Sequence, residues 1–292
     1  GSKDTRLQRL NEFPAMAIDR FAGFPLEYQI CSPCGIPVYV HFFLIAFFVW
    51  ELSNQEGAAR RPNGLPNYHQ AGLIGLTCLV SFLVLFLTVL LHEFGHCAGA
   101  KLVGGRVDRI LLWPLGGLAF CSSGGGAKGD LLVALAGPLT HAPQYLVWLG
   151  FFQLSLRCQQ QLGDWAHLVQ GVCRSAMQLQ ILLAVFNLLV PVYPLDCSQV
   201  IMALFRICGV SARNAAIFMV VLSLLAIGIL VASMAGVVHL PFLVLGYSTF
   251  NFLLIGWLAF QTFQLYNHIS KRTESNHPLL RQCQEDDRCR EV

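Results

Sequence analysis

Residues 78–100 read CLVSFLVLFLTVLLHEFGHCAGA, and the prediction of the fold starts from this segment. Its first part is almost entirely apolar, and about 20 such residues in a helix cross a bilayer. Three ionisable side chains, His92, Glu93 and His96, follow directly within the same span. Ionisable groups inside a membrane are costly, so they mark functional sites. The stretch therefore predicts a membrane helix that carries a site.

The composition of the whole chain agrees with a membrane protein. Of 292 residues, 55% are hydrophobic and 12% are charged, against roughly 45–50% and about 25% in soluble domains. Mean hydropathy is +0.58. These values exclude a soluble enzyme, a disordered chain and a nucleic-acid binder. A net charge of +3 implies no general affinity for polyanions.

The apolar segments predict an all-α polytopic membrane protein with six transmembrane helices. The expected spans are 36–52, 71–103, 130–156, 176–205 with a break near Pro191–Pro194, 214–240 and 242–267. Three parts follow: an N-terminal flank at 1–35, an intramembrane domain at 36–267 and a C-terminal tail at 268–292. No second soluble domain is expected.

The basic residues predict the orientation of these spans. Of the 19 Lys and Arg residues, 15 fall on the side that carries both termini. The opposite side has Arg60, Arg61, Arg157 and Arg174. Because loops rich in Lys and Arg stay in the cytosol, both termini are expected to be cytosolic. The membrane itself (Golgi or ER, plastid, or bacterial inner membrane) stays open.

His92-Glu93-Phe94-Gly95-His96 is an HExxH motif. On a helix, positions i and i+4 share a face, so both imidazoles reach one metal ion. The intervening Glu93 lies beside that face, where it can take a proton from a metal-activated water. The alternative is a structural histidine pair that is hydrogen-bonded between helices.

A catalytic zinc site takes three protein ligands and a water molecule. Asp196 is the other carboxylate deep in an apolar run, within NLLVPVYPLDCSQV. Both it and His96 are expected part-way in from the cytosolic side, which favours a shared site. The alternative role of Asp196 is an N-cap for the helix that starts near Cys197.

The segment between the second and third spans has a β-like character from Val107 to Phe120, interrupted by Pro114 and Gly116-Gly117. It is predicted to form a hairpin that dips into the membrane. Extended backbone is tolerated at membrane depth only where it lines a protein cavity. This hairpin is therefore expected to edge one.

Together, HEFGH, the tripeptide Ala136-Gly137-Pro138 and the later N…PxxPLD resemble the site-2 protease family of intramembrane zinc metalloproteases. The resemblance covers roughly residues 36–267. It implies a catalytic core made of the second to fourth spans. It also implies one Zn²⁺ on His92, His96 and Asp196, and Glu93 as acid and base. The expected substrate-binding residues are Gly116, Gly117, Leu118 and Asn187, with the hairpin holding a substrate in extended form.

Three positions depart from the family pattern. His141 stands where the family usually carries Asn, so we expect it either to donate to the oxyanion or to bind the metal as a fourth ligand. Cys197-Ser198 replaces a Gly-Gly pair. Asn187 lies nine residues before Asp196, where the family has eight.

The resulting function is a zinc-dependent endopeptidase that cleaves a transmembrane segment of a membrane protein, as in regulated intramembrane proteolysis. Its partners are then a transmembrane substrate protein and lipids, with the oligomeric state open. The alternatives are a divalent-metal transporter or sensor, and an inactive relative that binds membrane helices. The lone CxxC at Cys31 and Cys34 is expected to be a turn rather than a metal or redox site.

Overall fold

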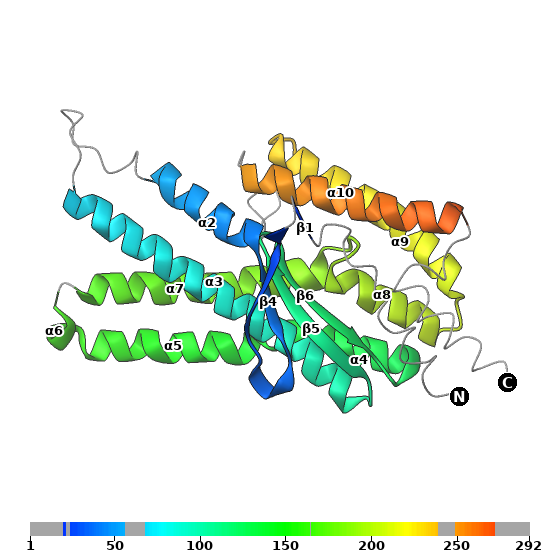
Figure 1. Cartoon of the computed structure of the whole chain (residues 1–292), viewed down its shortest axis with the longest axis horizontal. Coiled ribbons are helices and arrows are strands. Elements are labelled where there is room, and N and C mark those ends of the chain that lie inside the picture. Colours follow the sequence, from blue (N-terminus) through cyan, green and yellow to red (C-terminus); the bar gives the residue numbers. More distant parts are fainter. Residues whose placement is uncertain (1–19, 22–23, 56–67, 164, 239–248, 272–292) are drawn as a thin grey trace.

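A computed structural model describes residues 20–21, 24–55, 68–163, 165–238 and 249–271. Helices run back and forth along the long axis of the molecule, and a small sheet lies across them near the middle (Figure 1). Most of the two flanks and the junction between the fifth and sixth expected spans lie outside the described residues.

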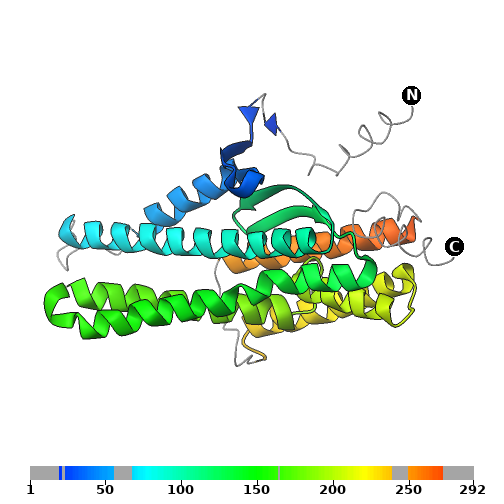
Figure 2. The same cartoon turned by 90° about the horizontal axis from the view of Figure 1, so that it is seen from below.

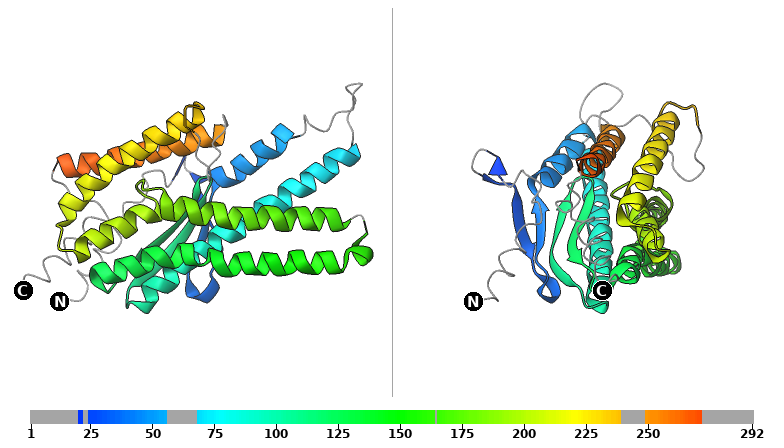
Figure 3. Two further views of the ribbon diagram at one scale, coloured as in Figure 1. Left: turned by 180° about the vertical axis from the view of Figure 1, so that it is seen from behind. Right: turned by 90° about the vertical axis from the view of Figure 1, so that its right-hand side faces the viewer.

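The sheet contains the predicted hairpin. Its strands are β3 (Glu27–Cys31), β4 (Val38–His41), β5 (Arg106–Trp113) and β6 (Gly116–Ser122), in the order β3-β4-β5-β6. The β5–β6 pair is antiparallel, so the hairpin is confirmed, whereas β4 and β5 run parallel. A separate two-stranded pair joins β1 (Arg20–Phe21) and β2 (Phe24–Pro25). The sheet covers one side of the helices (Figure 3).

The expectation of a helix from Ile36 is wrong for its first residues. Residues 38–41 form β4, and helix α2 (Phe42–Gln55) starts only after it. Val38 and Val40 are buried while their neighbours are less so, which is the period-2 pattern of a half-buried strand. Nonlocal pairing with β5 therefore overrides the apolar character that predicted a helix. The fold is mostly helical rather than all-α.

The HEFGH motif lies on α3 (Tyr68–Leu102), which packs against α4 (Gly126–Leu139). A Cβ atom added at Gly95 would lie 2.5 Å from the Ala136 carbonyl oxygen, and one at Gly99 would lie 2.8 Å from the Ala136 Cβ. Small residues thus bring the two helix backbones into close contact, as in many membrane helix pairs. Figure 2 shows α3 between the hairpin and this neighbour.

The third expected span is divided into α4 and α5 (His141–Arg157). Pro143 has no backbone N–H to donate to the carbonyl of Leu139, where α4 ends. After the short α6 (Gln159–Leu162), the chain returns antiparallel to α5 as α7 (Trp165–Leu189; Figure 2).

Helix α7 (Trp165–Leu189) begins earlier than expected, and α8 (Asp196–Ile207) completes the fourth span. The predicted break between them is confirmed, because residues 190–195 are not helical. A residue before proline is disfavoured in the helical region, so Pro191 ends α7 near Leu189.

The last two helices cover α8. Helix α9 (Ala212–Met234) packs along α10 (Thr249–Ser270) and against α8. Met202 of α8, Met219 of α9 and Leu265 of α10 meet in one buried cluster.

Three described helices are long and apolar enough to cross a membrane: α3 from Gly72 onward, α7 and α9. Helix α2 is apolar but shorter over Phe42–Ser53. On α3, an outward stripe at i, i+4 spacing is exposed and apolar, comprising Leu79, Leu83, Leu87 and Leu91. Such a surface fits lipid rather than water. The total of six spans stays a prediction.

Candidate metal centre

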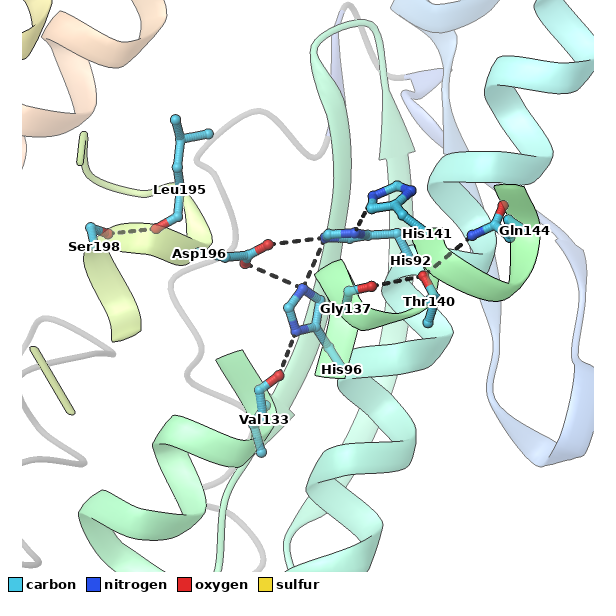
Figure 4. Close-up of polar contacts among 10 residues, drawn as sticks. All are labelled: His92, His96, Val133, Gly137, Thr140, His141, Gln144, Leu195, Asp196 and Ser198. Carbon is cyan, nitrogen blue, oxygen red and sulfur yellow. Dashed lines mark hydrogen bonds and ion pairs between the residues drawn. The ribbon is translucent and has the colours of Figure 1, made fainter. Parts of the chain in front are cut away.

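His92 and His96 lie on the same face of α3, one turn apart, and their Nε2 atoms are 3.0 Å apart. Both rings are buried, as is Glu93 between them. Figure 4 shows the two imidazoles pointing toward one another and toward α8. The i, i+4 spacing therefore brings both imidazoles to one place, as the sequence predicted.

Asp196 completes the group from the opposite side. Its carboxylate oxygens lie 3.1 Å from His92 Nε2 and 3.2 Å from His96 Nε2. The N-cap of α8 is Leu195, and no side-chain cap hydrogen bond is formed there. Asp196 is instead the first residue of the helix, where the dipole favours a carboxylate. The predicted grouping of these three side chains is confirmed.

Gly137 makes room for the His96 ring. A Cβ at this position would lie 2.2 Å from His96 Nε2 and 2.5 Å from its Cε1 atom. Any larger residue would displace the ring from its place over α4. The glycine of the AGP tripeptide is thus required by close packing on the His96 ring.

The donor set fits a divalent metal ion. His96 Nδ1 lies 2.8 Å from the Val133 carbonyl oxygen, which only accepts, so Nδ1 carries the proton. Nε2 is then the nitrogen that faces Asp196. Two imidazole nitrogens and a carboxylate gathered in one buried place form a donor set that suits a cation. The 3.0–3.2 Å separations are close to the ~3.3 Å that zinc bonds of about 2.0–2.1 Å give at tetrahedral angles.

Glu93 lies between this group and the hairpin. A Cβ added at Gly117 of β6 would lie 2.4 Å from Glu93 Cγ. A backbone hydrogen bond from Ala119 also reaches the Glu93 carboxylate. Strand β6 therefore positions this carboxylate, and it does so with backbone rather than with a side chain.

A cavity of about 430 Å³ joins these parts. Its lining includes the four residues of the HExxH–Asp group and every residue predicted to bind substrate, which are Gly116, Gly117, Leu118 and Asn187. Their substrate role stays a prediction. Trp113 and Trp257 meet edge to face where the hairpin approaches α10, and both line the cavity.

The cavity lining also includes an ion pair. Arg206 Nη1 donates to Asp130 Oδ2 at 2.5 Å, and Ser123 Oγ donates to the other oxygen of that carboxylate. Arg206 is only 1% exposed, so its charge is buried in this pair rather than solvated.

His141 contacts His92, on the side away from Asp196. Its Nε2 lies 3.1 Å from His92 Nδ1, and its Nδ1 lies 2.7 Å from Gln180 Oε1. Gln180 Nε2 in turn donates to Thr88 Oγ1 at 2.9 Å. The two roles expected for His141 stay predictions. Gln180 and Thr88 were missed, although polar residues within apolar helices were the available signal.

Cys121, Cys31 and Cys34 are free cysteines near the site and at the edge of the sheet. Cys121 of β6 lines the cavity, and burial raises the pKa of its thiol to about 12. It is therefore a neutral thiol at physiological pH. Cys31 and Cys34 are exposed around the turn η1 (Pro33–Gly35) between β3 and β4, and neither forms a disulfide.

The chain has relatives of known class. It is 28% identical over 180 residues to zinc metalloprotease MJ0392 of Methanocaldococcus jannaschii, which covers 58% of this chain and 43% of that protein. It is 31% identical over 127 residues to stage IV sporulation protein FB of Bacillus subtilis, covering 43% and 40%. The chain thus spans about two fifths of the length of these relatives. No family model matches it.

The fold is that of a solved site-2 protease. The structure of the site-2 protease from Methanocaldococcus jannaschii aligns with a TM-score of 0.52 and 21% identity, covering 82% of this chain and 94% of that one. The chain is thus similar in sequence to zinc metalloproteases and in fold to a site-2 protease. The predicted resemblance to the site-2 protease family is confirmed at this level.

Proposed function

We propose that the protein is a zinc-dependent endopeptidase that cleaves a transmembrane segment of another membrane protein. One observation carries the proposal: His92, His96 and Asp196 converge within 3.0–3.2 Å of one another beside the Glu93 carboxylate. This is a three-ligand set with an acid–base residue next to it, which is the composition of a catalytic zinc site.

A bound zinc ion would acidify a water molecule and polarise a peptide carbonyl. Glu93 would accept the proton of the attacking water at its carboxylate and return it to the leaving amine. The backbone contacts from Gly117 and Ala119 hold that carboxylate toward the histidines. Asp130 and Arg206 add polar groups to the cavity lining, where the attacking water would enter.

Strand β6 is the end strand of the four-stranded sheet and lines the cavity at Gly116, Gly117 and Leu118. An unwound substrate segment would add to its edge as a further strand, because main-chain hydrogen bonding of this kind does not depend on sequence. Unwinding exposes peptide carbonyls that are hydrogen-bonded within a helix. The partner is therefore a transmembrane protein whose helix opens locally.

The same proposal places the protein as a multi-pass integral membrane protein with both termini in the cytosol. The apolar helices α3, α7 and α9 and the outward leucine stripe on α3 support membrane insertion. The Lys and Arg asymmetry supports the orientation. Reporter fusions at each terminus test it, and a lumenal signal from either terminus would reverse the assignment.

Metal analysis combined with a cleavage assay tests the function. The purified chain in lipid nanodiscs is expected to hold one Zn²⁺ and to cleave a panel of labelled single-span peptides. Glu93→Gln should keep the zinc but lower turnover by about 10²–10⁴-fold, because Gln cannot take the proton.

Other outcomes would favour the alternative functions. Zinc binding without cleavage of any peptide would indicate an inactive relative that binds membrane helices. Zinc flux into sealed vesicles that is lost in His96→Ala would indicate a transporter. Near wild-type cleavage by Glu93→Gln would remove Glu93 from the acid–base role.

A further inference from the structure

Four buried polar side chains form a continuous hydrogen-bonded chain that ends on a ligand histidine. Thr88 and His92 belong to α3, Gln180 to α7 and His141 to α5. Their exposed fractions lie between 1% and 7%. The successive contacts measure 2.9 Å, 2.7 Å and 3.1 Å. A chain of polar groups buried in this way across three helices is costly unless each group is satisfied.

The donors and acceptors in this chain have a fixed direction. Because Gln180 Nε2 donates to Thr88, its Oε1 is the atom that faces His141, and a carbonyl oxygen only accepts. His141 Nδ1 therefore carries the proton, and in the neutral ring Nε2 keeps a lone pair. That lone pair accepts from the Nδ1–H of His92.

This direction of the hydrogen bonds determines the protonation of His92 Nε2, the nitrogen that would face the metal. With its proton on Nδ1, His92 presents an Nε2 lone pair toward Asp196 and His96. The reversed Gln180 amide would place its NH₂ group against His141. His141 would then hold its proton on Nε2 and donate it to His92 Nδ1. His92 would in turn carry a proton on Nε2, where it blocks coordination.

We infer that Gln180 is a positioning residue for the metal centre: with Thr88 fixing its amide and His141 passing the effect on, it sets the tautomer and ring orientation of His92. The inference rests on the proposed zinc site. It also accounts for the departure at position 141. Both nitrogens of His141 are engaged by His92 and Gln180, so neither is directed at the metal or at a substrate carbonyl in this arrangement.

Zinc affinity of the full chain tests the inference. Zn²⁺ would be titrated against a competing chelator for the wild type, Gln180→Leu and Thr88→Val. Outer-shell partners of ligand histidines are typically worth about 10–100-fold in metal affinity. Gln180→Leu should weaken binding by about that factor. Thr88→Val, which keeps the side-chain shape and only frees the amide to turn, should weaken it by at most about 10-fold.

Gln170→Leu is the matched control. Gln170 is a buried glutamine on the same helix, and no hydrogen bond reaches its Nε2. It lies ten residues from Gln180, or ~15 Å along the helix. This variant loses a buried amide without touching the chain of contacts, so its zinc affinity should equal that of the wild type.

A second readout follows the tautomer directly. Nitrogen-15 NMR of histidine-labelled protein at saturating Zn²⁺, where the metal rather than a proton would face Asp196, distinguishes a protonated from an unprotonated ring nitrogen. The wild type and Gln170→Leu should show His141 protonated on Nδ1 and unprotonated on Nε2, whereas Gln180→Leu should show a mixture of His141 tautomers. A purely structural role of Gln180 would lower thermal stability and leave this signal unchanged.

The outcomes separate the inference from the proposed function. If the wild type binds no zinc, the proposed function fails and the inference fails with it. If the wild type binds zinc but Gln180→Leu and Thr88→Val match Gln170→Leu in affinity and in the nitrogen-15 signal, only the inference is overturned. Should Gln180→Leu fail to fold, the conservative Thr88→Val decides by the same two measurements.

Discussion

His92 and His96 lie one turn apart on α3, yet their outer nitrogens are held in different ways. His96 Nδ1 donates to a backbone carbonyl, that of Val133 on α4. His92 Nδ1 instead contacts a side chain, His141, which depends on a second side chain, Gln180. One histidine is therefore fixed by helix packing and the other by a chain of side chains.

Because the two histidines are held differently, different substitutions should disturb the position of each one. No side-chain change removes a backbone carbonyl, so His96 is disturbed only through its packing between α3 and α4. Gly95 and Gly99 set the separation of the two helices, and Gly137 makes room for the ring. The support of His92 is removed by a single buried substitution that leaves the helix crossing unchanged.

Removing a ligand itself should have the largest effect on metal content. His92→Ala or His96→Ala should weaken zinc binding by more than about 10²-fold, since the loss of outer-shell partners alone costs about 10–100-fold. Elemental analysis after dialysis measures it. A fully metallated His96→Ala protein would contradict the ligand assignment.

Gly137→Ala should displace His96, the histidine that is held by helix packing, and should weaken zinc binding nearly as strongly. The new Cβ would lie 2.2 Å from His96 Nε2, so the ring must leave its place. We expect a loss of about 10²-fold in zinc affinity, comparable with the upper range for outer-shell changes. Gly150→Ala on α5, where nothing lies within 4 Å, is the control. Equal affinity of the two variants would show that Gly137 does not limit His96.

His141→Ala should disturb the ligand held by side chains by about 10–100-fold in zinc affinity. If His141 were an oxyanion donor instead, metal binding would persist and kcat would fall by about 10²–10³-fold. Zinc titration and kcat at saturating zinc separate the two. His141→Asn then shows whether an amide at this position supports turnover.

Gly117→Ala should have the smallest effect on the metal and act on chemistry alone. Its Cβ would lie 2.4 Å from Glu93 Cγ and move the carboxylate. Zinc affinity should stay unchanged, while turnover falls by about 10²-fold, within the range that acid–base catalysis supplies. Unchanged turnover would mean that Glu93 adapts without loss.

Local patterns in the sequence predicted most of the candidate site. The HExxH spacing, the break at Pro191–Pro194 and the hairpin glycines are all short-range signals that act within one element. They brought out His92, Glu93, His96 and Asp196, which line one cavity in the structure. The first span was predicted less well, because β4 forms only through parallel pairing with β5, far along the chain.

Apolar runs and motif spacing act through local geometry, so the sequence alone predicted the long apolar helices and singled out His92, His96 and Asp196 as a group. What holds each histidine in place follows from the packing of the helices. Thr88 and Gln180 are 92 residues apart, and His92 and His141 are 49 apart. Which amide atom meets which ring nitrogen depends on how α3, α5 and α7 pack, and no local pattern carries that information.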